Sequence, residues 1–93
     1  MRAKRVDLNQ AEIIAALRAA GATVADTHTV GAGFPDLVVG IAGKTVLVEV
    51  KAEAGPLRLT EPERRFMCEW RGDPVRILRT MADVEELILW ACG

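Results

Sequence analysis

Two apolar, β-branched runs joined by a two-residue turn constrain the fold of this chain more than any other feature. Residues 37–41 (Leu-Val-Val-Gly-Ile) and 44–50 (Lys-Thr-Val-Leu-Val-Glu-Val) flank residues 42–43 (Ala-Gly). This arrangement predicts a β-hairpin. With two turn residues, Ile41 pairs with Lys44, and the residue numbers of every further pair add up to 85. A loop with an even number of residues keeps this register, whereas an odd number would shift it.

The predicted register places three charged side chains on one face of the hairpin. Asp36 lies directly opposite Glu49, and directly opposed residues share a face with Cβ atoms about 4.5 to 5.5 Å apart. Side chains alternate between faces with a period of two, so Lys51 joins the face of Glu49. Two unit charges about 4 Å apart repel by roughly 4 kcal/mol at an effective dielectric constant near 20. A purely structural hairpin is therefore not expected to pair two carboxylates.

A divalent cation would relieve this repulsion. Mg²⁺ takes oxygen ligands, usually one or two carboxylates together with waters and substrate phosphate oxygens. A neighbouring ammonium group would hold or activate an attacking water, or stabilise negative charge on a phosphate in the transition state. The alternative is that Asp36 caps a turn after Pro35, while Glu49 and Lys51 form a solvated strand face. Each residue taken singly favours that alternative.

The spacing of these residues also resembles a known family. Residues 33–36 (Gly-Phe-Pro-Asp) followed by residues 49–51 (Glu-Val-Lys) resemble the PD-(D/E)xK nuclease superfamily and, within it, the small virus-type replication-repair nuclease (VRR-NUC) domain. The similarity covers nearly the whole chain, from a leading helix with Glu12 to a helix start at residues 59–60 (Leu-Thr) and a late strand and helix. The resemblance implies a small restriction-endonuclease-like α/β fold that uses Mg²⁺ or Mn²⁺.

The resemblance implies roles for individual residues. Asp36 and Glu49 would bind the catalytic metal, and the carbonyl group of Val50 would add a ligand. Lys51 would orient the nucleophilic water. Glu12 would occupy the acidic position on the first helix, as a catalytic and metal-site residue.

Glu12 and Glu63 both fit a second pattern, the capping box, in which a Glu reaches back to the N-cap backbone. Glu12 fits it in residues 9–12 (Asn-Gln-Ala-Glu), although residues 7–10 (Asp-Leu-Asn-Gln) offer a competing helix start. Capping and metal binding therefore both stay open for Glu12. Glu63 fits it in residues 60–63 (Thr-Glu-Pro-Glu), at a place where the family often has Gln. For Glu63 we favour the cap, which leaves a catalytic part for it open.

The remaining sequence predicts an α/β domain with the element order αβββαβα and a mixed sheet flanked by helices. Helical spacing of apolar residues, with Gly21 and Gly72 as ends, and β-branched runs define the other elements. These are a helix over 10–20, a strand over 22–27, a helix over 61–71, a strand over 75–79 and a helix after the N-cap Thr80.

Two groups of apolar residues lie on the later helices. Phe66, Met67 and Trp70 form a stripe at helical spacing that we expect to belong to the core. Leu89 and Trp90 lie off the apolar stripe of the last helix. An apolar residue in excess of a core face hints at a dimer surface.

Length and cysteine usage bound the class of protein. The 93 residues are expected to form one domain over 1–93, and a chain of this size buries only about 60 to 65 % of its unfolded surface, so a partner subunit would help it. Cys68 and Cys92 lack metal-ligand spacing, and without a signal-peptide pattern this fits a reduced cytoplasm in a bacterium or a phage-infected host cell. No apolar run approaches the roughly 20 residues of a membrane span, so no membrane partner is expected.

The charge balance bears on nucleic acid as a partner. A formal net charge of -1 is not typical of a strong non-specific DNA binder. A bound cation would neutralise the metal-site carboxylates, so the formal net charge of -1 overstates the negative charge of the metal-bound protein. Basic residues also cluster at the beginning of the chain and near the second helix, where they are either solvated surface or DNA contacts. They are Arg2, Lys4, Arg5, Arg58, Arg64 and Arg65.

Together these patterns predict a metal-dependent endonuclease that hydrolyses DNA phosphodiester bonds. Symmetric cleavage of two strands needs two sites, so a homodimer is the expected form. The resemblance to Holliday-junction-resolvase-like enzymes implies structure-selective cleavage of branched DNA. The alternatives are a nicking or end-processing nuclease of a phage replication or packaging system, and a non-catalytic DNA-binding or interaction module that keeps the fold.

Overall fold

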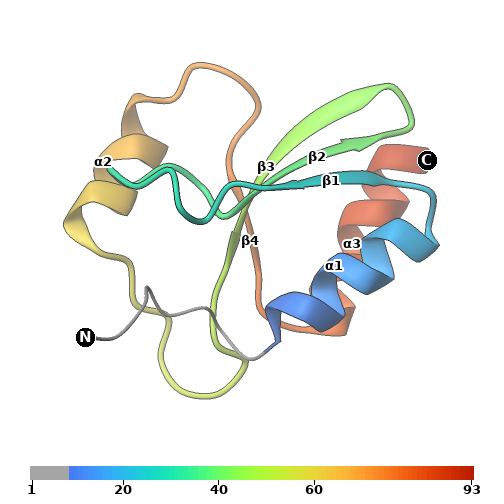
Figure 1. Cartoon of the computed structure of the whole chain (residues 1–93), viewed down its shortest axis with the longest axis horizontal. Helices are drawn as coiled ribbons and strands as arrows, with labels where there is room; N and C mark the ends of the chain where they lie inside the picture. The colour runs from blue at the N-terminus through green and yellow to red at the C-terminus, as the bar shows by residue number, and fades with distance from the viewer. Residues whose placement is uncertain (1–8) are drawn as a thin grey trace.

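The computed structural model describes residues 9–93, which form a single mixed sheet and three helices (Figure 1). The elements are α1 (Gln10–Ala19), β1 (Thr23–Asp26), β2 (Leu37–Ile41), β3 (Lys44–Val50), α2 (Glu61–Glu69), β4 (Arg76–Leu78) and α3 (Met81–Cys92). This order confirms the predicted αβββαβα arrangement and the α/β class. Within these described residues, no helix is both long and apolar enough to cross a membrane.

The sheet has the strand order β1-β2-β3-β4, in which the first three strands are antiparallel and β4 runs parallel to β3. The β2–β3 hairpin has the predicted register, because Ile41 pairs with Lys44 and Leu37 pairs with Val48. Both turn residues have positive φ, 52° at Ala42 and 79° at Gly43. Positive φ at both central residues is the feature of a type I′ turn, whose twist matches that of the flanking strands.

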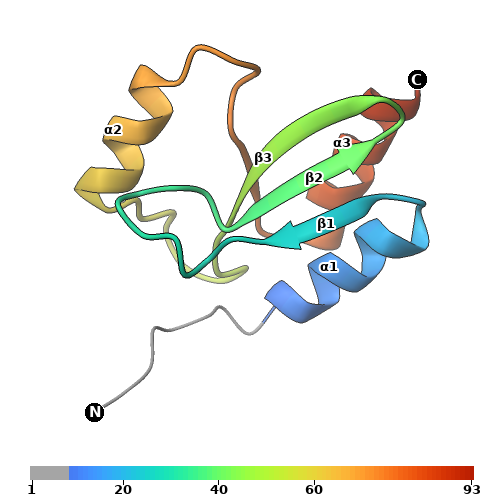
Figure 2. The same ribbon diagram turned by 45° about the horizontal axis from the view of Figure 1, so that its top comes forward.

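One face of the sheet forms the hydrophobic core. Alternate residues of β2 and β3 are buried on this face, and α1 and α3 cover it (Figure 2). Ile13 and Leu17 of α1 and Val84 and Leu87 of α3 are at most 2 % exposed. The sheet residues of the same cluster are Val24, Leu37, Val39, Ile41, Val46, Val48, Val50 and Leu78.

The helix α2 stands apart from α1 and α3, at the other end of the sheet (Figure 1, Figure 2). It buries no residue, since Phe66 and Met67 are only partly buried and Trp70 is 41 % exposed. The prediction that this apolar stripe belongs to the core is therefore wrong. The stripe instead contacts the loop between β1 and β2, where the Phe34 and Phe66 rings meet edge to face with centroids 5.4 Å apart.

The end of α2 also differs from the prediction. The helix stops at Glu69 because Trp70 takes an extended conformation, with φ -66° and ψ 128°, and its ring stacks on Phe66. Gly72 is not the helix cap. A Cβ atom at Gly72 would lie 2.7 Å from the indole nitrogen of Trp70, so this glycine makes room for the ring. Gly21, with φ 95°, ends α1 as predicted.

Candidate functional site

The hairpin brings Asp36, Glu49 and Lys51 together on the sheet face opposite the α1–α3 core. Asp36 directly precedes β2, so the next step of the observed register places it opposite Glu49. The amide of Val50 donates a hydrogen bond of 2.9 Å to Oδ2 of Asp36. Lys51 Nζ lies 3.6 Å from Oε2 of Glu49. The register predicted from the turn length therefore extends to the charged residues.

The carbonyl oxygen of Val50, which lies beside these carboxylates, receives no hydrogen bond from Pro35 on the neighbouring strand segment. The amide of Lys51 donates to the carbonyl of Leu78 in β4. Since successive residues of a strand direct their N–H and C=O groups to opposite sides, the N–H and C=O groups of Val50 point toward β2. If the register is continued two residues beyond the pair Leu37–Val48, the residue opposite Val50 is Pro35, which has no N–H group. The amide of Val50 is bound by Asp36, whereas its carbonyl oxygen faces a residue that cannot donate.

Glu63 of α2 joins this group, which the sequence did not reveal. Its Oε1 atom accepts a 2.7 Å hydrogen bond from Lys51 Nζ and a 2.9 Å hydrogen bond from the amide of Thr60. The Thr60 hydroxyl in turn accepts from the amide of Glu63, at 3.2 Å. The predicted capping box is confirmed, and the same carboxylate also binds Lys51. The only sequence signal for the second contact was the position at which the family often has Gln.

The backbone of the loop that contains Asp36 lies very close to the backbone of the first turn of α2. Gly33 has φ 81°, and a Cβ atom built on it would lie 2.2 Å from the carbonyl oxygen of Pro62. No side chain fits at this position, so the loop lies directly on the first turn of α2. Figure 2 shows the loop between β1 and β2 reaching that helix.

Burial and mutual repulsion make Glu49 a weak acid. Its side chain is 3 % exposed, and burial, with the neighbouring Glu63 and Asp36, raises its pKa to about 9. Burial also raises the pKa of Asp36, although the Val50 amide opposes this. Burial lowers the pKa of Lys51, but Glu63 and Glu49 outweigh it, so the pKa is raised overall. The Glu49 carboxyl therefore holds a proton at neutral pH when no cation is present.

The donor set fits a hard divalent cation. Within residues 9–93, no three His, Cys, Asp or Glu side chains converge in a geometry for a metal ion. The group formed by Asp36, Glu49 and the Val50 carbonyl needs only two carboxylates, because Mg²⁺ takes its other ligands from waters and substrate phosphates. The pKa values of the partly buried Asp36 and the buried Glu49 are both raised, and a bound cation would favour the ionised form of both carboxyl groups.

Glu12 does not join this group in the structure. It is exposed on the first turn of α1 and makes no hydrogen bond or ion pair with Asp36, Glu49 or Lys51. The alternative prediction, a capping box with Asn9, is wrong, because the Asn9 side chain accepts no hydrogen bond from the backbone of the first turn of α1. Its Nδ2 atom donates to the carbonyl oxygens of Lys51 and Arg79, at 3.2 and 2.8 Å. Asn9 therefore ties the start of α1 to the end of β3.

One of the predicted DNA contacts lies beside Lys51. Arg58 and Lys51 line a hollow on the loop after β3, together with Ala52, Ala54 and Pro56. Arg79 stabilises this loop, since its guanidinium donates to the carbonyl oxygens of Ala52 and Gly55. The hollow is therefore lined by two positively charged side chains, those of Lys51 and Arg58, next to the carboxyl groups of Asp36 and Glu49.

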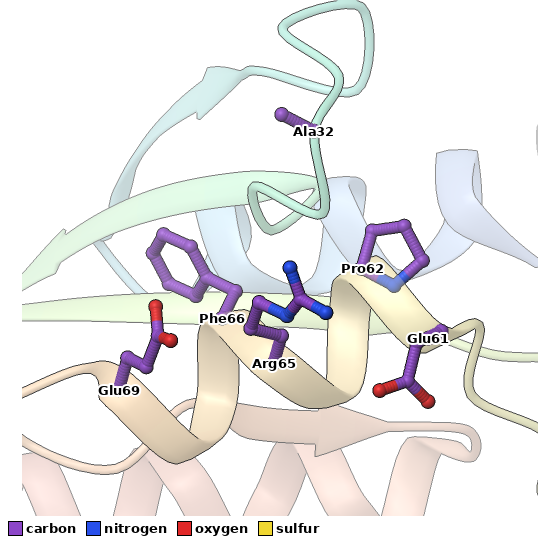
Figure 3. A pocket seen from close by; sticks show the side chains of 6 residues that line it. All are labelled: Ala32, Glu61, Pro62, Arg65, Phe66 and Glu69. Atoms are coloured by element: carbon purple, nitrogen blue, oxygen red, sulfur yellow. The ribbon is translucent and has the colours of Figure 1, made fainter.

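The other predicted DNA contacts are dispersed. Arg65 lines a shallow hollow between α2 and the β1–β2 loop, with Phe66 and Ala32 (Figure 3). The exposed Arg64 pairs with Glu61 at 3.7 Å. Lys4 and Arg5, like Arg2, lie outside the described residues.

Comparisons of this chain with protein-family models, with curated proteins and with solved structures find no match. The assignment of a function therefore depends on the geometry and chemistry of the Asp36, Glu49 and Lys51 site.

Proposed function

We propose that this protein is a metal-dependent nuclease that hydrolyses DNA phosphodiester bonds, of the PD-(D/E)xK and VRR-NUC type. One observation supports this most strongly. The buried carboxyl group of Glu49 and the partly buried carboxyl group of Asp36 share a sheet face with the ammonium group of Lys51. A hairpin without a ligand gains nothing from placing these charges together.

Each residue has a distinct part in this proposal. Asp36, Glu49 and the carbonyl oxygen of Val50 hold a Mg²⁺ or Mn²⁺ ion. When bound, such an ion makes a water more acidic and draws charge away from a phosphate. The carboxylate of Asp36 accepts from the Val50 amide through Oδ2 and also contacts the Glu49 carboxyl group, a contact that a bound cation would replace. Lys51 Nζ, 3.6 Å from Glu49, orients the attacking water or stabilises charge on the phosphate.

The hollow beside Lys51 suits the DNA backbone. Arg58 and Lys51 line it together, and the bond to be cut would lie at its Lys51 end. Arginine binds phosphate oxygens with two parallel hydrogen bonds. With a formal net charge of -1, the chain is expected to make few phosphate contacts, so its affinity depends on this site rather than on a broad basic surface.

A homodimer acting on branched DNA remains the most specific form of the proposal. One chain presents one site, whereas two symmetric cuts need two. Exposed apolar side chains on α3 support an association surface, with Leu89 72 % exposed and the adjacent Trp90 40 % exposed. The cleavage of a four-way junction would follow from two such sites in one dimer.

Labelled single-stranded, duplex, flap and four-way-junction DNA incubated with Mg²⁺ or Mn²⁺ tests this function. We expect the wild type to cut the branched substrates best and Lys51→Ala to lose about 10²- to 10⁴-fold in rate. Equal cleavage by Lys51→Ala would refute the catalytic assignment. Cleavage of linear DNA alone would refute the preference for branches, and no cleavage of any substrate would favour a non-catalytic module.

A further inference from the structure

We propose that Glu63 is a positioning residue for Lys51, so that the first turn of α2 is part of the hydrolytic site. This inference rests on the proposed nuclease function. Lys51 has a flexible side chain with three N–H donors, and within β3 its ammonium group has only the longer ion pair with Glu49. The 2.7 Å bond to Glu63 is shorter than the contact with Glu49, which lies 3.6 Å away.

Glu63 is itself held on both sides. Its Oε1 atom accepts from Lys51 Nζ and from the amide of Thr60, so one oxygen links the ammonium group to the helix N-terminus. The side chain of Glu63 is 18 % exposed and that of Lys51 is 17 % exposed, so water competes little for the pair. The first turn of α2 lies directly on the loop that contains Asp36, because Gly33 has no side chain to keep the carbonyl of Pro62 away.

The α3 helix shows that capping alone does not require this residue. Its capping box uses Asp83, whose Oδ2 atom accepts from the amide of Thr80 at 3.1 Å. An aspartate therefore completes the same motif at the same helical position in this chain. The additional methylene of Glu63 is what allows its carboxylate to bind the Thr60 amide and Lys51 together. Among residues 9–93, Asp83 has no ion pair with an ammonium group, which makes it a matched control.

Single-turnover cleavage of the preferred DNA in Mg²⁺, with DNA affinity measured in Ca²⁺, tests this role in four variants. Glu63→Asp keeps the cap and the charge but withdraws the carboxylate, and we expect a rate loss of about 10-fold or more with unchanged affinity. Glu63→Gln keeps both acceptor contacts and should stay within about threefold of the wild type. Glu63→Ala should lose about 10- to 100-fold. Asp83→Ala should lower the melting temperature but keep the rate of the wild type.

A second measurement separates positioning from general stabilisation. Combined with Lys51→Ala, the Glu63→Asp change should cause no further loss, because the group that Glu63 positions is gone. An additive loss, or a Glu63→Asp protein that cuts at the wild-type rate, would overturn the positioning role. A wild type that cuts no DNA would instead refute the proposed function, so the two failures are distinguishable.

Discussion

The two faces of the sheet differ in what covers them. The face with Leu37, Val39 and Val48 is apolar and lies under α1 and α3. The opposite face has Asp36 and Glu49 near its end, where Lys51 meets the first turn of α2. Both faces come from the same two strands, because the alternation of side chains sends successive residues to opposite sides. The single hairpin thus provides six of the fourteen described residues of the core cluster and most of the site.

One face of the sheet therefore mainly stabilises the fold, whereas the other face carries the residues of the candidate site. The core face is closed, whereas the site face contains the buried carboxyl group of Glu49, whose ionisation opposes folding when no cation is bound. Substitutions on the two faces are therefore expected to differ in kind. Core changes should lower stability, and site changes should lower activity or even raise stability.

Leucine-to-alanine changes on the two faces test the first half of the comparison. Leu17→Ala removes a fully buried side chain from the core and should cost about 2 to 5 kcal/mol of unfolding free energy. Leu47→Ala, on the site face and outside the core cluster, should cost roughly 1 to 2 kcal/mol. Urea denaturation measures both. Equal losses would show that the site face is packed as tightly as the core.

The contact between Gly33 and α2 should matter next most. Gly33→Ala meets the Pro62 carbonyl and a φ of 81°, so it should cost about 1 to 3 kcal/mol and lower cleavage about 10-fold by displacing Glu63. Gly31→Ala has a similar φ of 83° but no atom within 4 Å of its Cβ, so it serves as the control for backbone strain alone. Thermal unfolding and cleavage assays give both effects. If the two variants behave alike, the close approach has no part in the site.

Glu49→Gln should raise stability in the absence of metal. The pKa of Glu49 is raised in the folded protein, so its stabilising contribution is full below about pH 4.5 and is lost as the pH rises toward about 9. Glutamine does not ionise, and the variant should gain on the order of 1 kcal/mol at neutral pH, or about 4 to 8 °C in Tm. The gain should increase between pH 5 and 8 in melting experiments. A variant that is less stable than the wild type throughout this range would contradict the assigned protonation state.

The smallest expected effect concerns the DNA backbone. Arg58→Ala should weaken DNA affinity roughly two- to fivefold and reduce the slope of log affinity against log salt by about 1. Arg64→Ala should change the affinity less, because Arg64 is paired with Glu61 away from the Lys51 hollow. Titrations at several salt concentrations measure both slopes. A larger effect for Arg64 would move the DNA path to the exposed side of α2.

Local patterns predicted the parts of the site that depend on the hairpin. A two-residue turn and β-branched strands defined the register, and the register placed Asp36 opposite Glu49. The capping box of Glu63 was also predictable, because its partner Thr60 is three residues away. In each case the interacting groups are close in sequence, or are connected by one regular ladder.

Long-range placement accounts for what the sequence did not predict. The contact between Glu63 and Lys51 depends on where α2 lies, which helical periodicity does not determine. The same periodicity predicted a core stripe on α2, although the helix lies at the end of the sheet. The predicted box with Glu12 failed because Asn9 binds carbonyl oxygens far along the chain, at Lys51 and Arg79.

Calorimetric titration of the protein with Mn²⁺ near pH 7, in buffers of different ionisation enthalpy, tests the central claim most directly. Asp36 and Glu49 must be ionised to bind a cation, and the pKa of Glu49 is about 9, so one bound Mn²⁺ should release about one proton. Glu49→Gln should lose both the binding and the proton release. No binding by the wild type, or equal binding without proton release in both proteins, would contradict a cation site on this face of the hairpin.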